Sequence, residues 1–222
     1  MSEPGAKPRL FLVDDHRLML EGMALALQDQ YEIVGCSLQG EGVAEACREL
    51  LPDAVLLDLS LPDRSGLEVI MDLREAAPDA RVIVVTMHAD RIMADASFQS
   101  GAHGFLPKDA GTAELKQALE HVLAGGLFIS ELIPKQTHHT TPTDSAAWLG
   151  RLTPRQQQIV RMLGEGKRTQ DIAAELNIEP STVTFHRVRI RKALGIETEW
   201  GLVRYALLVR MSEQEARRRE SQ

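Results

Sequence analysis

The sequence predicts an α/β domain with a doubly wound, five-stranded parallel sheet, followed by an all-α domain of four helices. Over residues 8–126, short apolar runs alternate five times with amphipathic helical segments. This alternation is typical of a parallel sheet with helices on both faces. Over residues 149–212 every periodic segment is helical, and no internal repeat is present. The chain is therefore expected to fold as two different domains joined by residues 127–148.

The five expected strands are short and mostly apolar throughout, as in a sheet that is covered on both faces. They are RLFLV at 9–13, YEIVGCS at 31–37, AVLLD at 54–58, RVIVVT at 81–86 and GFL at 104–106. The helices that follow them are expected at about 16–28, 42–51, 66–77, 91–100 and 112–125. Gly125 and Gly126 are typical residues for the end of the last of these helices.

The segment 127–148 is rich in Thr, Pro, Ser and His and has no periodicity, so we interpret it as a linker. Thr153 followed by Pro154 is a helix start signal, with a capping residue before a proline at the first helical position. Four helices are expected in the second domain, at 154–165, 169–176, 181–194 and 198–211. The charged residues after 211 are expected to fray.

Charge is divided unevenly along the chain of 222 residues, which has a net charge of −7. Residues 1–130 carry 10 Lys and Arg against 21 Asp and Glu, whereas residues 131–222 carry 15 against 11. This asymmetry favours a basic, nucleic-acid-binding module carried by an acidic one. No apolar run approaches the ~18 residues that span a bilayer, and no signal peptide is recognisable, so we expect a cytoplasmic protein without a membrane partner.

Polar side chains gather at the carboxyl ends of the expected strands. Asp14 and Asp15 follow the first strand, Asp58 ends the third, Thr86 ends the fourth and Lys108 follows the fifth. Ligands of parallel α/β sheets bind at this edge. Neighbouring carboxylates repel one another and attract a hard cation such as Mg²⁺. A carboxylate in such a site can attack phosphorus and form an aspartyl phosphate.

The helix expected at 181–194 has one apolar face, formed by Val183, Ile190 and Leu194. Its opposite face carries Ser181, Thr184, Phe185, Val188, Arg189 and Lys192. In a DNA major groove Phe185 could contact thymine methyl groups while Arg189 contacts base edges. The alternatives are a protein–protein surface or a second contact with the domain core. His186 flanks the apolar face and is either a partly buried core residue or a phosphate contact.

Several motifs resemble those of known families. The motifs VDD, LLDLSLPDRSG, VVT and GFLPKD resemble the CheY-like, flavodoxin-like receiver domain of two-component response regulators, over roughly residues 8–125. The motifs LTPRQQQIV, TQDIAAELNI and STVTFHRVRIRKALG resemble the LuxR-type helix-turn-helix module. The whole chain is thus similar to the NarL/FixJ family of response regulators.

The resemblance implies a DNA-binding transcriptional response regulator that a sensor histidine kinase phosphorylates on Asp58. It implies Mg²⁺ ligands from the side chains of Asp14, Asp15 and Asp58 and the backbone carbonyl of Ser60. Thr86, Phe105 and Lys108 match the family's switch and phosphate-binding residues, and His88 falls where the family tunes dephosphorylation.

In the second domain the resemblance implies contacts with double-stranded promoter DNA and a homodimer when the chain is phosphorylated. Trp200, Val203 and Leu207 are the candidates for dimer contacts. Replacing Thr184 or Arg189 is expected to change sequence preference more than replacing Arg187. The expected DNA contacts come from the helix at 181–194 and are Ser181, Thr182, Thr184, Phe185, His186, Val188, Arg189 and Lys192.

The sequence leaves three other functions to consider. A regulator that is independent of phosphorylation and controlled by protein contacts on the receiver is the main alternative. A phosphatase of the haloacid dehalogenase type needs a second aspartate where this chain has Ser60, so a turnover enzyme is not expected. A nucleotide- or flavin-binding module is disfavoured because no glycine-rich loop follows the first strand.

Overall fold

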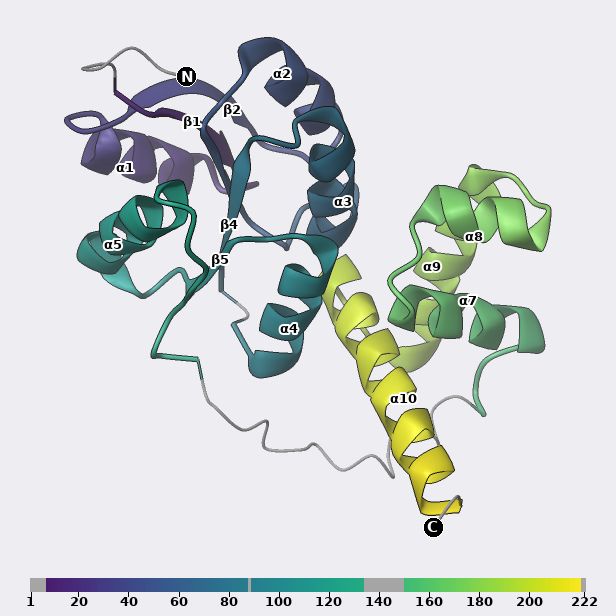
Figure 1. Cartoon of the computed structure of the whole chain (residues 1–222). Coiled ribbons are helices and arrows are strands. Elements are labelled where there is room, and N and C mark those ends of the chain that lie inside the picture. The colour runs from purple at the N-terminus through teal and green to yellow at the C-terminus, as the bar shows by residue number, and fades with distance from the viewer. Residues whose placement is uncertain (1–6, 88, 134–149, 221–222) are drawn as a thin grey trace. The chain divides into compact units, whose positions relative to one another are not determined.

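The computed structural model describes residues 7–87, 89–133 and 150–220 of the chain (Figure 1). The chain divides into two compact units, Met1–Gln136 and Thr137–Gln222, each with its own hydrophobic core. The part of the expected linker from residue 134 to 148 lies outside the described residues.

The first unit is a parallel sheet with the strand order β2-β1-β3-β4-β5-β6. Figure 1 shows α1 and α5 on one face of this sheet and α2, α3 and α4 on the other, which confirms the doubly wound arrangement. The strands are β1 (Arg9–Val13), β2 (Glu32–Ser37), β3 (Ala54–Leu57), β4 (Arg81–Thr86), β5 (Gly104–Pro107) and β6 (Phe128–Ile129). The helices are α1 (Arg17–Leu27), α2 (Val43–Leu50), α3 (Gly66–Ala76), α4 (Arg91–Ser100) and α5 (Gly111–Leu123).

Alternation along the buried strands sends successive side chains to opposite faces of the sheet. Leu10 and Leu12 of β1 join the cluster that packs against α1 and α5, together with Leu56 of β3 and Leu106 of β5. The intervening Phe11 is equally buried but lies outside that cluster. The strands are therefore apolar at every position because both of their faces are covered.

The expectation of five strands was wrong by one short strand. Residues Phe128 and Ile129, which were expected to begin the linker, pair in parallel with β5 as β6. The backbone N–H groups of Phe128 and Ser130 donate to the carbonyls of His103 and Phe105, at 2.9 and 3.0 Å. A two-residue strand after a Gly-Gly pair is too short to show a periodicity of its own, so the sequence pattern did not indicate it.

The second unit consists of α7 (Pro154–Gly164), α8 (Thr169–Leu176), α9 (Pro180–Leu194) and α10 (Glu199–Glu220). The expected start of α7 is confirmed as a capping box, in which Thr153 Oγ1 accepts from the N–H of Gln156 and Gln156 Oε1 accepts from the N–H of Thr153. The core joins all four helices through residues such as Ile159, Ile172 and Ile190.

Helix α10 is longer than expected, because it continues to Glu220 instead of ending near residue 211. Its first half carries core residues such as Leu202 and Val209. The ion pair between Arg161 Nε and Glu213 Oε1, at 2.8 Å, ties a later turn to α7. The charged residues after 211 have no apolar stripe. They remain helical because extending a helix that already packs in the core is easier than starting a new one.

His103 in the turn before β5 gives the first unit a pH dependence. Its Nδ1 accepts a hydrogen bond of 3.1 Å from the backbone N–H of Val82, which requires an unprotonated nitrogen. Burial lowers the pKa of His103 below its usual value, and the charges of Arg81 and Arg74 lower it further. Below about pH 6.5 the unfolded chain therefore binds a proton at His103 more readily than the folded chain does, so the free energy of unfolding decreases as the pH falls.

We expect the His103→Asn variant to lose this contribution, because the amide oxygen can accept the same hydrogen bond but does not titrate. Urea unfolding at pH 7.5 and at pH 5.5 checks this. The free energy of unfolding of the wild type should fall more between these two pH values than that of the variant. Equal falls in both proteins would show that the histidine is not the titrating group.

In the described part of the chain, no helix has the length and apolar character needed to cross a membrane.

Candidate functional site

The acidic residues that follow β1 and β3 meet at the point where the strand order reverses. The register pairs Val13 with Leu57, so the next residues, Asp14 and Asp58, leave the sheet side by side. The backbone N–H of Asp58 donates to the carbonyl of Val13 at 2.9 Å, which extends the ladder to this residue. Such a switch point is the usual ligand site of an open parallel sheet.

Lys108 joins the two aspartates from the loop after β5. Its Nζ lies 2.6 Å from Asp14 Oδ2 and 2.8 Å from Asp58 Oδ2. The three side chains are only 1–2 % exposed, so this is a buried ionic cluster. Burial alone would lower the pKa of Lys108, but hydrogen bonds to Asp14 and Asp58 and their negative charges outweigh it and raise the pKa above its usual value. The lysine therefore stays charged.

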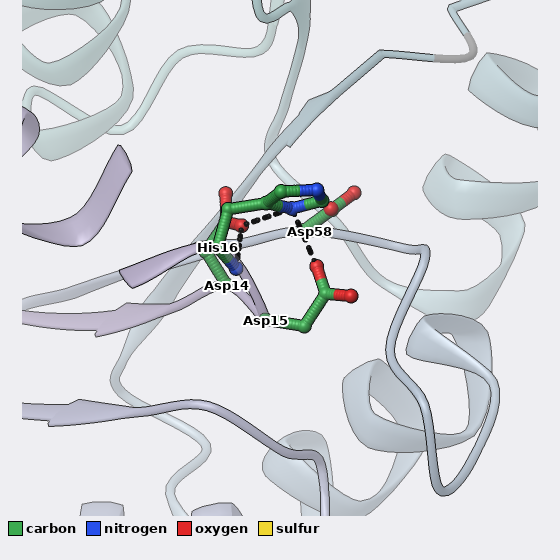
Figure 2. Close-up of side chains that lie close together, drawn as sticks. All are labelled: Asp14, Asp15, His16 and Asp58. Atoms are coloured by element: carbon green, nitrogen blue, oxygen red, sulfur yellow. Dashed lines mark hydrogen bonds and ion pairs between the residues drawn. The ribbon is translucent and has the colours of Figure 1, made fainter. Parts of the chain in front are cut away.

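Asp15 and His16 form the outer side of this pocket (Figure 2). His16 Nδ1 lies 2.7 Å from Asp15 Oδ1 and 3.2 Å from Asp14 Oδ1, and the backbone N–H of His16 donates to Asp14 Oδ1 at 2.8 Å. His16 was not among the residues expected in the pocket. Its position directly after the Asp-Asp pair was the only sequence signal that could have indicated it.

The pocket has the donor set of a divalent cation site. One oxygen or nitrogen atom from each of Asp14, Asp15, His16 and Asp58 lies within 4.8 Å of the others. Three carboxylates face the single charged amine of Lys108, so negative charge is left over for a cation. Carboxylate oxygens are the ligands that Mg²⁺ prefers, and the residues present fit this ion. The backbone of Ser60 is also close, since its N–H donates to Asp58 Oδ1 at 3.1 Å.

The two switch candidates lie on the neighbouring strands β4 and β5, and Thr86 contacts a residue of the pocket. Thr86 is fully buried at the end of β4, and its carbonyl accepts from the backbone N–H of Lys108 at 2.9 Å. Phe105 is also fully buried, on β5, where it pairs in register with Val84. His88 lies outside the described residues.

The solvent-facing side of α9 contains all six residues that the helical periodicity placed there. Ser181, Thr184, Phe185, Val188, Arg189 and Lys192 are exposed. The guanidinium carbon of Arg189 lies 4.6 Å from the centre of the Phe185 ring, as in a cation–π pair. Thr182 and His186 are half-buried at the edges of this face. The Nδ1 atom of His186 is buried without a hydrogen-bond partner, which favours its packing against the core.

Arg187 differs from the other basic residues of α9, because it points into the domain. It is 5 % exposed, and its Nε and Nη2 lie 2.6 and 2.5 Å from Glu199 Oε1 at the start of α10. It also donates to the hydroxyl of Thr169 on α8. Arg187 thus holds three helices together, and the expectation that its replacement changes sequence preference less than replacement of Thr184 or Arg189 stays a prediction.

The candidate dimer residues on α10 differ in exposure. Val203 is buried, whereas Trp200 and Leu207 are half-buried. None of the three belongs to the hydrophobic cluster of the second unit, in contrast to their neighbours Leu202 and Ala206.

The fold and pocket define a class of protein. An acidic pocket with a buried lysine at the switch point of a parallel sheet, followed by a helix-turn-helix unit, is the architecture of a DNA-binding two-component response regulator. A family model described as response regulator receiver domain matches residues 10–120. A second model, described as bacterial regulatory proteins, luxR family, matches residues 151–206.

Whole proteins of the same kind are similar to this chain. Transcriptional regulatory protein MctR of Rhizobium johnstonii is 34% identical over 203 residues, which cover 90% of this chain and 94% of MctR. Response regulator GacA of Pseudomonas aeruginosa is 34% identical over 201 residues, which cover 86% and 91% of the two chains.

A solved structure agrees with these matches. The crystal structure of a LuxR-family two-component response regulator from Aurantimonas sp. SI85-9A1 is 34% identical, with a TM-score of 0.55, and covers 58% of this chain and 93% of that chain. The chain belongs to the NarL/FixJ family of response regulators. It is a DNA-binding transcriptional regulator of two-component type, and such proteins are regulators and not turnover enzymes.

Proposed function

We propose that Asp58 accepts a phosphoryl group from a sensor histidine kinase and that this modification changes dimerisation and promoter binding. The observation that carries the proposal is the position of Asp58. It is a buried carboxylate at the switch point, and its Oδ2 lies 2.8 Å from the amine of Lys108. Burying a charged carboxylate costs free energy of folding. Ionisable groups in such buried, paired positions are typical of functional sites, which favours a chemical role for Asp58.

The transfer is a displacement at phosphorus. An oxygen of Asp58 attacks the phosphorus of a phosphohistidine on the kinase, and a new P–O bond forms. The P–N bond breaks, and its electron pair stays on the imidazole nitrogen, which takes up a proton from water. Lys108 holds its positive charge beside Asp58 throughout and offsets negative charge on the transferred group. The product is an aspartyl phosphate.

Asp14, Asp15 and Asp58, with the backbone carbonyl of Ser60, are the proposed ligands of Mg²⁺. When bound, this ion supplies positive charge that balances the carboxylates and the phosphoryl oxygens. His16 Nδ1 contacts Oδ1 of both Asp14 and Asp15, so His16 would lose these contacts to the extent that the two oxygens bind the metal instead.

The proposed output passes from the pocket to the second unit. Thr86 and Phe105 change position when the phosphoryl group is present, and the chain dimerises through residues that include Trp200, Val203 and Leu207. The second unit then binds double-stranded promoter DNA through α9. The exposed face of α9 supports DNA binding. It carries the positive charges of Arg189 and Lys192 and none of its six residues is acidic, so its charge is complementary to a phosphate backbone.

Removal of the metal tests the proposal. The full-length protein is incubated with acetyl phosphate, with Mg²⁺ or with excess EDTA, and acyl phosphate is measured by its cleavage with hydroxylamine. Phosphate incorporation is expected with Mg²⁺ and not with EDTA, because the uncompensated carboxylates repel the anionic donor. The Asp15→Asn variant should need more Mg²⁺ for the same incorporation.

Two outcomes would contradict the proposal. Equal labelling in EDTA would exclude a metal-dependent transfer. No labelling in any condition, from acetyl phosphate or from a phosphorylated kinase domain, would instead favour a regulator controlled by protein contacts on the receiver.

A further inference from the structure

Two large apolar side chains of α9, Phe185 and Val188, are exposed on the surface of the second unit. Phe185 is 53 % exposed and Val188 is 49 % exposed. Among the described residues of the second unit, 150–220, these are the only large apolar side chains with such exposure. They lie three residues apart and hence on the same side of the helix. The domain thus leaves one small apolar patch uncovered, and it does so in the middle of its basic face.

The patch is surrounded by groups that suit nucleic acid. Arg189 lies against the Phe185 ring, with 4.6 Å from its guanidinium carbon to the ring centre, and Lys192 is exposed one turn further on. None of the six exposed residues of this face is acidic. Thr184 donates its hydroxyl hydrogen to the carbonyl of Pro180 at 3.2 Å, so it offers an acceptor but no free donor to a ligand.

These observations narrow the chemistry of a bound base pair. In the major groove only thymine presents a methyl group, at C5, and guanine presents two acceptors, O6 and N7, that match an arginine fork. An apolar patch can pack against the thymine methyl group, and a guanidinium can donate hydrogen bonds to O6 and N7 of guanine. The contact between Arg189 and Phe185 keeps these two groups together, so the bases that they contact lie at neighbouring positions.

We propose that α9 selects a thymine through its C5 methyl group, which packs against Phe185 and Val188, beside a guanine that Arg189 recognises. This inference rests on the proposed DNA binding of the second unit and adds the sequence class to it. A protein–protein contact of the same patch is the competing explanation, and the experiment below separates the two.

The experiment uses the full-length protein and a duplex selected by it from a randomised library. The selected duplex is synthesised again with deoxyuridine in place of each thymine in turn, which removes one methyl group and nothing else. We expect at least one substitution per bound helix to weaken binding about fourfold, the effect of one methyl-sized group leaving an apolar contact. Fluorescence anisotropy measures the dissociation constants.

Variants assign the effect to the patch. In Phe185→Ala and Val188→Ala the ratio between the uridine and thymine duplexes should fall towards one, because the apolar partner of the methyl group is gone. Leu25→Ala, which removes an even more exposed apolar side chain from α1, should keep the wild-type ratio. In Arg189→Ala the ratio between the uridine and thymine duplexes should persist. Replacing the neighbouring guanine with 7-deazaguanine, which lacks the N7 acceptor, should weaken binding by the wild type but not by Arg189→Ala.

The outcomes separate this inference from the proposed function. If no duplex is selected, with or without beryllofluoride and Mg²⁺, the proposed DNA binding itself is wrong. If a duplex is bound but no uridine substitution weakens binding, DNA binding stands and the methyl contact is wrong. If Phe185→Ala leaves DNA affinity unchanged for every duplex, Phe185 contributes no contact with DNA and the inference is overturned.

Discussion

Replacing Asp58 with Asn is expected to reduce phosphate incorporation from acetyl phosphate, or from a phosphorylated kinase, to the background of the assay. The amide has nearly the shape of the carboxylate, so the pocket should stay folded. Its one oxygen can accept from Lys108 Nζ or from the N–H of Ser60, whereas the two oxygens of Asp58 accept from both. It lacks the anionic oxygen that attacks phosphorus. Hydroxylamine-sensitive phosphate and intact mass are the measurements.

A neighbouring acid provides the control for this variant. Asp109 follows Lys108 directly and is exposed, so Asp109→Asn removes the same charge close to the pocket without touching the cluster. It should incorporate phosphate like the wild type. Incorporation by Asp58→Asn at the wild-type level would place the phosphoacceptor elsewhere and would overturn the assignment.

Replacing Arg187 with Ala should destabilise the second unit by roughly 3–5 kcal/mol, the range found when one partner of a buried ion pair is removed. The change leaves Glu199 with only the longer contact to Arg191 Nε, at 3.5 Å, and removes the link from α9 to Thr169 of α8. Both tryptophans of the chain, Trp148 and Trp200, lie in the second half. Tryptophan fluorescence during urea unfolding therefore measures this unit selectively.

The exposed Arg189 is the matched control, because it lies on the same helix and carries the same charge. Arg189→Ala should keep the wild-type unfolding midpoint and lose affinity for DNA, whereas Arg187→Ala should lose both together. A wild-type midpoint for Arg187→Ala would mean that the buried pair contributes nothing to stability. Its desolvation would then equal its attraction, as is known for some buried pairs.

Most of the fold could be predicted from the sequence, because the periodic signals were long and consistent. The strands at 9–13 and 81–86 and the helices at 91–100 and 169–176 have the predicted bounds in the structure. The short β6 and the last turns of α10 could not be predicted, since two residues are too few to show a periodicity and the last turns of α10 carry no apolar stripe. Both depend on an element that already exists, the edge of β5 and the first half of α10.

The pocket was predicted to a similar extent. Parallel strands end at one edge of a sheet, so the order of the motifs alone brought Asp14, Asp58 and Lys108 together. The pairwise contacts could not be predicted, because they depend on side-chain positions. The structure shows that Lys108 bridges Asp14 and Asp58 and that His16 lies between Asp14 and Asp15.

The sequence by itself determined the two kinds of domain, the acidic edge of the sheet and the exposed face of α9, because hydrophobic periodicity and strand order are properties of local sequence. Only the tertiary structure decided which charges are structural. Arg187 and Arg189 are two arginines on one helix and differ by two residues, which is about half a turn. One is buried against Glu199 and the other is exposed beside Phe185, because the neighbouring helices α8 and α10 cover only one side of α9.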